Sequence, residues 1–182
     1  PGYARAHLNL GIGLEATGDA DGAIGQYEAA LVIDAANAYA NYNLAKLLYA
    51  RGDLARAEPL LKAALESKPD FPEAQVVLSN LYDTQGNLSA AAGALEAALK
   101  QRPDYAGAWN NYGVVLSKLG RPAEAETALR RATELDPSLL PAFQQLGNIL
   151  SEQGQVADAL ASYRRDIELR PDFPEAHANL GC

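Results

Sequence analysis

The chain has 182 residues, 48% of them hydrophobic, and a formal net charge of −8. The negative charge disfavours nonspecific nucleic-acid binding, which requires a basic surface, and no stretch approaches the ~18 consecutive apolar residues of a membrane span. The only cysteine is the last residue, Cys182, so the chain can form neither an internal disulfide nor a multi-cysteine metal site. Because the chain contains no methionine, we expect a segment of a longer polypeptide. We expect that polypeptide to be soluble and favour the cytoplasm.

A 34-residue internal repeat organises the sequence. The hexapeptide PDFPEA occurs at 69–74 and again at 171–176, three periods later. Glycine recurs at the same interval, at Gly18, Gly52, Gly86, Gly120 and Gly154, and proline at Pro69, Pro103, Pro137 and Pro171. Such a period indicates a repeat architecture. We interpret residues 1–182 as one array, with full repeats at 4–37, 38–71, 72–105, 106–139 and 140–173 and a partial repeat at 174–182.

Each repeat begins with a predicted helix. Counting from the first residue of a repeat, position 3 is alanine, position 7 is leucine or tyrosine, and position 8 is small. Offsets of three, four and eight residues place these positions on one helical face, which we expect to be buried. Position 7 comprises Leu10, Leu44, Leu78, Tyr112, Leu146 and Leu180. Position 8 comprises Gly11, Ala45, Ser79, Gly113, Gly147 and Gly181.

A second predicted helix completes each repeat. The glycine at position 15 ends the first helix, because glycine adopts the left-handed C-terminal cap without steric penalty. Alanine at position 20, leucine or tyrosine at position 24, and alanine at position 27 mark the second helix. Asp166 replaces that last alanine in repeat 5, which puts the packing of this repeat in question. Two helices per repeat predict an all-α fold.

The repeated hexapeptide marks the junction between repeats. Pro69 ends one repeat, and Asp70 is placed to cap the next helix, with Glu73 completing a capping box. Pro72 falls in the first turn, where a missing N–H costs little. Asp172, Pro174 and Glu175 repeat this arrangement. We therefore interpret the hexapeptide as structural.

These positions resemble those of the tetratricopeptide repeat family over essentially the whole chain. The segment AWNNYGVVLSKLGRPAEAETALRRATELDP carries Trp109, Gly113, Gly120, Ala125 and Pro137 at signature positions of the family. Ala35 departs from the pattern by replacing the terminal proline of repeat 1. The resemblance implies an α-solenoid of antiparallel helix pairs in a right-handed superhelix. It also implies that positions 2, 5, 6, 9, 12 and 13 of each first helix line a concave, protein-binding groove.

Asparagine recurs at position 6 of the implied groove. The residues there are Asn9, Asn43, Val77, Asn111, Gln145 and Asn179. Asparagine is a mediocre helix former, and its amide offers two donors and an acceptor that suit the backbone of an extended peptide. The pattern resembles the asparagine ladder of O-linked N-acetylglucosamine transferases and their bacterial relatives. The alternative is that these amides are family consensus and only face water.

Aromatic residues are concentrated in repeat 2. Tyr39, Tyr42 and Tyr49 share one stripe of a helix, and Lys46 lies between them in the implied groove lining. With Leu8, Ile12, Val76 and Val77, the tyrosines would make the N-terminal half of the groove apolar. Alternatively, they pack against each other and against adjacent repeats. The C-terminal half is rich in amides, at Asn110, Asn111, Gln144, Gln145 and Asn148. We predict a ligand that is apolar at one end and held by its backbone at the other.

No pattern in the sequence indicates catalysis. His7 and His177 lie five repeats apart and cannot share a metal, and no set of nucleophile, base and oxyanion donors is found. We expect no enzyme activity, cofactor or metal. Position 5 carries no basic residue, which disfavours the clamp with which some tetratricopeptide domains hold chaperone termini.

Three functional interpretations remain. The preferred one is a non-catalytic protein–protein interaction module that binds an extended peptide or protein segment in the groove. The second is the substrate-recruiting arm of a larger enzyme such as a glycosyltransferase. The third is a scaffold that self-associates through open repeat ends. At the C-terminal end, a disulfide between two copies of Cys182 would strengthen this association. None of the three involves nucleic acid or a membrane.

Overall fold

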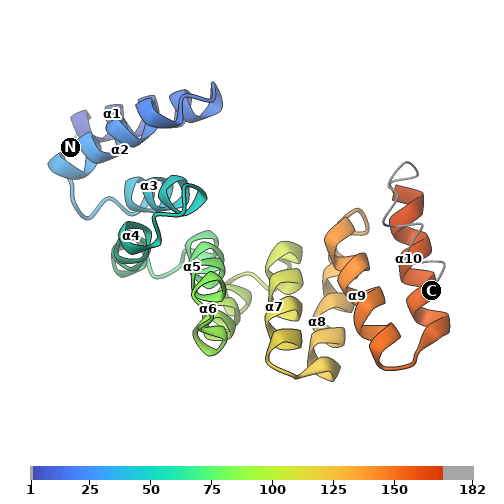
Figure 1. Cartoon of the computed structure of the whole chain (residues 1–182). Helices are drawn as coiled ribbons and strands as arrows, with labels where there is room; N and C mark the ends of the chain where they lie inside the picture. The colour runs from blue at the N-terminus through green and yellow to red at the C-terminus, as the bar shows by residue number, and fades with distance from the viewer. Residues whose placement is uncertain (1, 170–182) are drawn as a thin grey trace. The chain divides into compact units, whose positions relative to one another are not determined.

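The computed structural model describes residues 2–169, which form ten α-helices and no β-strand (Figure 1). The helices are α1 (Gly2–Ala16), α2 (Ala20–Ile33), α3 (Ala38–Ala50), α4 (Leu54–Ser67), α5 (Pro72–Thr84), α6 (Leu88–Gln101), α7 (Ala106–Lys118), α8 (Pro122–Leu135), α9 (Leu140–Glu152) and α10 (Val156–Leu169). The all-α, solenoid-type prediction is confirmed. From α3 on, each odd-numbered helix begins at the first residue of a predicted repeat. The right-handed superhelix stays a prediction.

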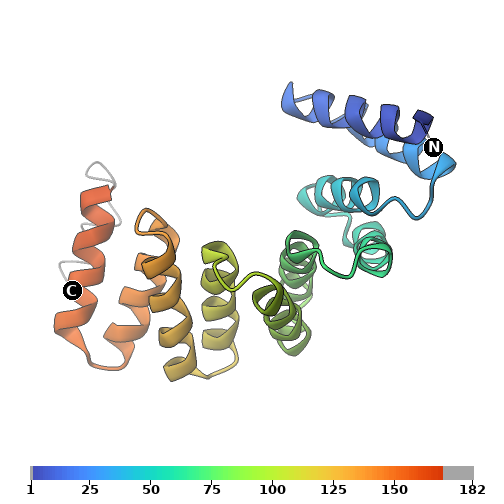
Figure 2. The same cartoon turned by 180° about the vertical axis from the view of Figure 1, so that it is seen from behind.

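The helices belong to two compact units, which divide between Gln85 and Gly86. In the first unit α1 packs against α2, α2 against α3, α3 against α4 and α4 against α5. In the second unit α6 packs against α7, α7 against α8, α8 against α9 and α9 against α10. Figures 1 and 2 show the two helices of a repeat lying side by side, for example α3 with α4 and α7 with α8. The first helices of neighbouring repeats also touch, α3 with α5 and α7 with α9.

The turn between the helices of a repeat is built from a glycine and a capping side chain. Gly52 has a φ of +80°, a conformation that residues with a Cβ rarely adopt, and the other four turn glycines share it. This confirms the predicted end of the first helix. In the first three repeats the second helix starts with a side-chain cap. Asp19 accepts a hydrogen bond from Gly22 N, Asp53 from Arg56 N and Asn87 from Ala90 N.

The core follows the predicted face of each repeat, with exceptions in α1, where Ala6 at position 3 and Leu10 at position 7 are exposed. Position 24 is fully buried at Tyr27, Leu61, Leu95 and Leu129. At position 7, Leu44 is 3% exposed, but Leu10 is 52% exposed, so its predicted burial is wrong. Position 7 reaches the second helix of the preceding repeat, as the hydrogen bond from Tyr112 OH to Glu96 Oε1 (2.7 Å) shows. Within residues 2–169 no helix precedes α1, so the helix that would pack over Leu10 is absent from that range.

The predicted capping box at Asp70 and Glu73 is wrong. Helix α5 begins at Pro72, and its N-cap is Phe71, which makes no side-chain capping hydrogen bond. Because Pro72 is pre-organised for the first helical position, the cap falls at Phe71 and Glu73 is one residue too early for the box. Asp70 is exposed, whereas the Phe71 side chain is only 3% exposed. The second copy of the motif, with Asp172 and Glu175, lies outside the described residues.

The departure from the repeat pattern at Asp166 lies in the last described helix, α10. This carboxylate replaces the alanine of other repeats and is fully buried in α10. Helix α10 nevertheless packs against α9, with Ala159 and Tyr163 in the core of the second unit. Among residues 2–169, no helix has the length and apolar character needed to cross a membrane.

Candidate functional site

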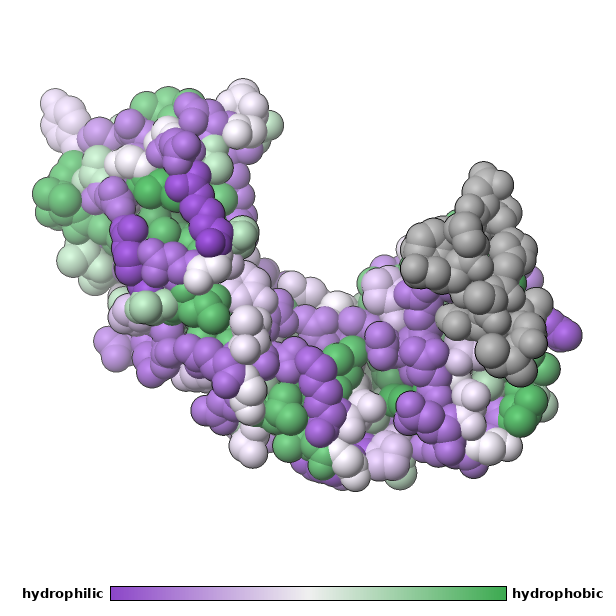
Figure 3. Space-filling model, in the orientation of Figure 1, coloured by the Kyte–Doolittle hydropathy of each residue, from purple (hydrophilic) through white to green (hydrophobic). Residues whose placement is uncertain are grey.

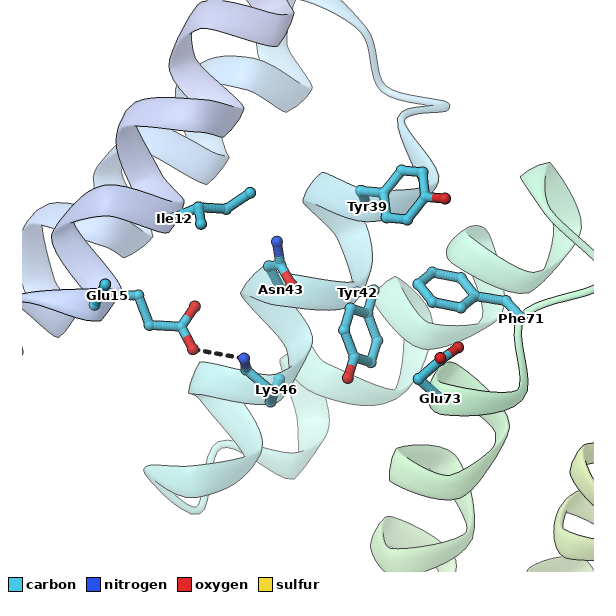
Figure 4. A pocket seen from close by; sticks show the side chains of 9 residues that line it. Ile12, Glu15, Tyr39, Tyr42, Asn43, Lys46, Phe71 and Glu73 are labelled. Carbon is cyan, nitrogen blue, oxygen red and sulfur yellow. Dashed lines mark ion pairs between the residues drawn. The ribbon is translucent and has the colours of Figure 1, made fainter. Parts of the chain in front are cut away.

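The first unit contains a hollow of about 570 Å³ between α1, α3 and the start of α5 (Figure 4). Helix α3 provides Tyr39, Tyr42, Asn43 and Lys46. Their spacing of three, four and seven residues places them on one helical face. Helix α1 provides Ile12, Glu15 and Ala16 from the facing side, and Phe71 and Glu73 complete the lining. The α1 and α3 residues occupy groove positions that the family resemblance implied.

Three aromatic rings form one side of the hollow. The Phe71 ring lies against Tyr39, with centroids 5.3 Å apart and planes at 59°, and against Tyr42, with centroids 4.8 Å apart and planes at 48°. Tilted aromatic pairs at these distances are mutually stabilising. Phe71 is buried, whereas Tyr39 is 50% exposed. The two tyrosines therefore pack on the buried Phe71 ring and expose aromatic surface to the hollow.

Lys68 holds two of these rings from the side. Its Nζ donates a hydrogen bond of 2.8 Å to Tyr39 OH. The same ammonium lies 4.6 Å from the Tyr39 centroid and 4.4 Å from the Phe71 centroid, within the range of cation–π attraction. These contacts restrict the ring of Tyr39 although half of that residue is exposed.

An ion pair between two residues that line the hollow joins α1 to α3 (Figure 4). Lys46 Nζ lies 2.5 Å from Glu15 Oε1 and 6.0 Å from the centroid of Tyr42. The second Glu15 oxygen accepts a hydrogen bond of 2.9 Å from the buried Tyr27 OH. Burial, together with the hydrogen bond to Glu15, raises the pKa of Tyr27 well above its usual value. Tyr27 therefore stays protonated as a donor and fixes the carboxylate that in turn holds Lys46.

The amide of Asn43 lies in the middle of the hollow. Figure 4 shows its side chain between Ile12 and the two tyrosines. Within residues 2–169 the Asn43 side chain has no hydrogen-bond partner, and it is half-buried. Its two donors and its acceptor therefore face the hollow. This is the arrangement that the asparagine hypothesis requires at this position.

Two other predicted residues of the first unit lie elsewhere. Tyr49 OH lies 3.2 Å from Thr84 Oγ1 and 3.5 Å from Asn80 O, so this tyrosine packs against α5 outside the hollow. The alternative interpretation, packing against an adjacent repeat, therefore describes Tyr49 but not Tyr39. Asn9 is exposed on α1 and does not line the hollow.

Some of the predicted amide side chains of the second unit form hydrogen bonds inside that unit. Asn110 Nδ2 donates a hydrogen bond of 3.1 Å to Asn111 Oδ1, and Asn148 Oδ1 accepts one of 2.9 Å from Tyr163 OH. Gln144 and Gln145 are half-buried on α9. Asn179 lies outside the described residues. A ladder of asparagines through both units stays a prediction.

Phe71 and Lys68 are the contributors that sequence reasoning missed. Phe71 was interpreted only as part of the structural hexapeptide PDFPEA, and Lys68 was not singled out. One signal for Phe71 was available, because the last position of a repeat is aromatic in three cases, Phe71, Tyr105 and Phe173. Among the described residues, no three or more His, Cys, Asp or Glu side chains are grouped to hold a metal ion.

Comparisons with known proteins agree with the repeat pattern. Family models described as tetratricopeptide repeat match residues 14–81, 48–95 and 76–139, and one described as TPR repeat matches 147–181. A comparison with curated protein sequences gave no match. Solved structures of other proteins are similar over most of the chain.

The crystal structure of MamA is 25% identical, with a TM-score of 0.79 over 88% of this chain and 94% of that one. YrrB, described as a TPR protein with an unusual peptide-binding site, is 20% identical, with a TM-score of 0.78 over 97% of this chain and 91% of that one. PilF of Pseudomonas aeruginosa is 18% identical, with a TM-score of 0.87 over 97% of this chain and 81% of that one. The likeness to YrrB and PilF shows the fold alone.

Proposed function

Since the chain belongs to the tetratricopeptide repeat family, we propose that this protein-interaction module binds an extended segment of a partner protein in the hollow of its first unit. The observation that carries the proposal is the combination, in one hollow, of exposed apolar side chains with the Asn43 amide, which has no hydrogen-bond partner within residues 2–169. Fold alone does not assign function, which depends on the side chains of the site.

An apolar side chain of the partner fits the aromatic side of the hollow. Ile12 is 47% exposed and Tyr39 is 50% exposed, and they lie on opposite sides of it. Covering this surface removes apolar area from water, which is the main driving force of association. Because Lys68 and Phe71 already restrict Tyr39, little ordering is needed on binding.

Asn43 is placed to hold the backbone of the same segment. A side-chain amide can donate to a peptide carbonyl and accept from a peptide N–H whatever side chain the peptide carries. The neighbouring Lys46 is engaged by Glu15, which leaves Asn43 as the neutral polar group at the centre of the hollow. Recognition would then combine one apolar anchor with sequence-tolerant backbone contacts.

The peptide-binding site named for YrrB supports this kind of use for the fold. A free-standing module and the recruiting arm of a larger enzyme would use the same hollow, so the proposal covers both. Self-association through the C-terminal end and Cys182 concerns positions outside the described residues.

A display of random linear peptides tests the proposal with two matched pairs of variants. Ile12→Ser removes an exposed apolar side chain of the hollow, and Val32→Ser removes one that is 88% exposed on α2. Asn43→Ala and Asn9→Ala change the same repeat position inside and outside the hollow. Selected peptides should bind Ile12→Ser and Asn43→Ala about tenfold more weakly than wild type, as for a loss of ~1.4 kcal/mol.

The two control variants, Val32→Ser and Asn9→Ala, should bind like wild type. Equal weakening by Asn9→Ala would show that the asparagines act as a ladder rather than through the hollow. Peptides that bind all four variants like wild type would refute the hollow as the site.

A further inference from the structure

We infer that the segment bound in this hollow contains proline in the polyproline II conformation and carries basic side chains beside it. The inference rests on the proposed function and specifies the chemistry of the partner. It draws on the aromatic geometry, on the unused hydrogen-bond donors and on the charge of the first unit.

The aromatic side of the hollow suits a proline ring. Tyr39 and Tyr42 lie one turn apart on α3, and both are tilted by about 50–60° against Phe71. Ile12 faces them from α1 (Figure 4). This side of the hollow is apolar and bounded by aromatic rings, which is the kind of surface that polyproline II segments use in other domains. A flat, rigid pyrrolidine ring packs on such a surface with little loss of conformational entropy.

The polar groups in and beside the hollow match a polyproline II backbone. This conformation makes no internal hydrogen bonds, so every carbonyl of the segment is available as an acceptor. Asn43 brings two N–H donors without a partner inside residues 2–169. Tyr39 OH accepts from Lys68 and keeps its own hydrogen to donate. Proline contributes no backbone N–H, so a proline segment needs donors from the protein, as found here.

The other common modes of peptide recognition fit less well. Strand addition requires an exposed sheet edge, and residues 2–169 contain no strand. Binding of an amphipathic helix requires an apolar groove that accepts anchors over two turns, about 10 Å. Here the ion pair of Glu15 and Lys46 joins α1 to α3 beside the apolar part. Figure 3 shows hydrophobic and hydrophilic residues interspersed over the visible face of the molecule rather than one long apolar strip.

Charge favours a basic segment. Two carboxylates, Glu15 and Glu73, and one ammonium, Lys46, line the hollow. Lys68 places a second ammonium against its aromatic side, so the negative charge comes from the unit as a whole. Residues 1–85, which form the first unit, contain eleven acidic and six basic side chains, a formal charge of −5. Lysine or arginine beside the proline would be attracted by this field, which raises the rate of association and selects against acidic segments.

Three capped peptides test the inference against the intact chain. The first has four prolines between two lysines, the second replaces the prolines by alanines, and the third replaces the lysines by glutamates. The first should bind about tenfold or more tightly than either of the others, and its advantage over the glutamate peptide should shrink at about 1 M salt. It should shift the amide NMR signals of Tyr39 and Asn43. Tyr42→Leu should weaken it severalfold, and Tyr105→Leu, in the second unit, should not.

Equal binding of the alanine peptide or of the glutamate peptide would overturn the inference, as would no binding of the proline peptide. The peptide display separates this failure from that of the proposed function. Displayed peptides that depend on Asn43 but contain no proline would leave the function standing and refute the inference. Displayed peptides that bind the Asn43→Ala and Ile12→Ser variants like wild type would refute both the proposed function and the inference.

Discussion

The ring of Tyr27 lies directly against the backbone of Gly11. A Cβ built on Gly11 would come within 2.5 Å of Tyr27 Cε1. The same relationship recurs between Gly147 and Tyr163 in the second unit. In both repeats the tyrosine passes the glycine and bonds to a residue of the first helix, Tyr27 to Glu15 and Tyr163 to Asn148. The small residue at position 8 therefore makes room for a side chain that, in the first unit, supports the hollow through Glu15.

Gly11→Ala should lower the free energy of unfolding by about 1–3 kcal/mol, because Tyr27 is fully buried and cannot move aside. Gly13→Ala, on the same helix with nothing within 4 Å of the added Cβ, should instead raise it by up to ~1 kcal/mol through helix propensity. Urea denaturation of the two variants measures the difference. The double variant Gly11→Ala/Tyr27→Leu, which reproduces the pairing of Ala45 and Leu61, should recover part of the loss. Equal stabilities for both single variants would contradict the close packing.

Leu44→Ala and Leu10→Ala change the same repeat position in two environments. Leu44 is 3% exposed, so its truncation should cost about 2–5 kcal/mol from lost burial and a cavity. Leu10 is 52% exposed, and its truncation should cost less than ~1 kcal/mol. Thermal denaturation of both variants measures the two losses of stability. A large loss for Leu10→Ala would mean that this side chain is covered in solution.

Asn41→Ala should lower the free energy of unfolding by about 1–3 kcal/mol. Asn41 is 2% exposed, and its Nδ2 donates to Ala35 O at 2.9 Å and to Asn37 O at 3.1 Å. Trp109 occupies the same repeat position, and its Nε1 donates to Pro103 O, also six residues back. The substitution leaves the carbonyl of Ala35 without this donor. Asn9→Ala, at an exposed site, is the control and should change stability little. Chemical denaturation that ranks the two variants equally would rule out this role.

Stability above pH 10 should depend on Tyr112. Burial, and then its hydrogen bond to Glu96, raises the pKa of Tyr112 to about 12, from about 10 in an unfolded chain. Above pH 10 the unfolded state therefore binds fewer protons than the native state, and the free energy of unfolding falls as pH rises to about 12. In urea denaturation between pH 10 and about 12, the free energy of unfolding of Tyr112→Phe should decline less steeply than that of wild type. Tyr3→Phe, at a residue 80% exposed, should decline like wild type. Identical profiles for all three proteins would contradict the prediction.

Local sequence signals identified the helices and turns because these depend on neighbouring residues. A glycine at position 15 adopts positive φ whatever packs around it, so Gly52 marks the end of α3 directly from the sequence. Alanine and leucine at fixed offsets identified the core at Ala57 and Leu61. The same reasoning was wrong for Asp70, because the proline two residues later moved the cap to Phe71.

The sequence by itself therefore determined the 34-residue period, the helix pairs, most of the buried face and five lining residues, Ile12, Tyr39, Tyr42, Asn43 and Lys46. Only the tertiary structure decided that Phe71 and Lys68 complete the aromatic side, that Tyr27 fixes Glu15, and that Tyr49 lies outside the hollow. The physical reason is distance along the chain. Periodicity specifies which face a residue occupies on its own helix, whereas the hollow depends on how α1, α3 and the start of α5 meet across tens of residues.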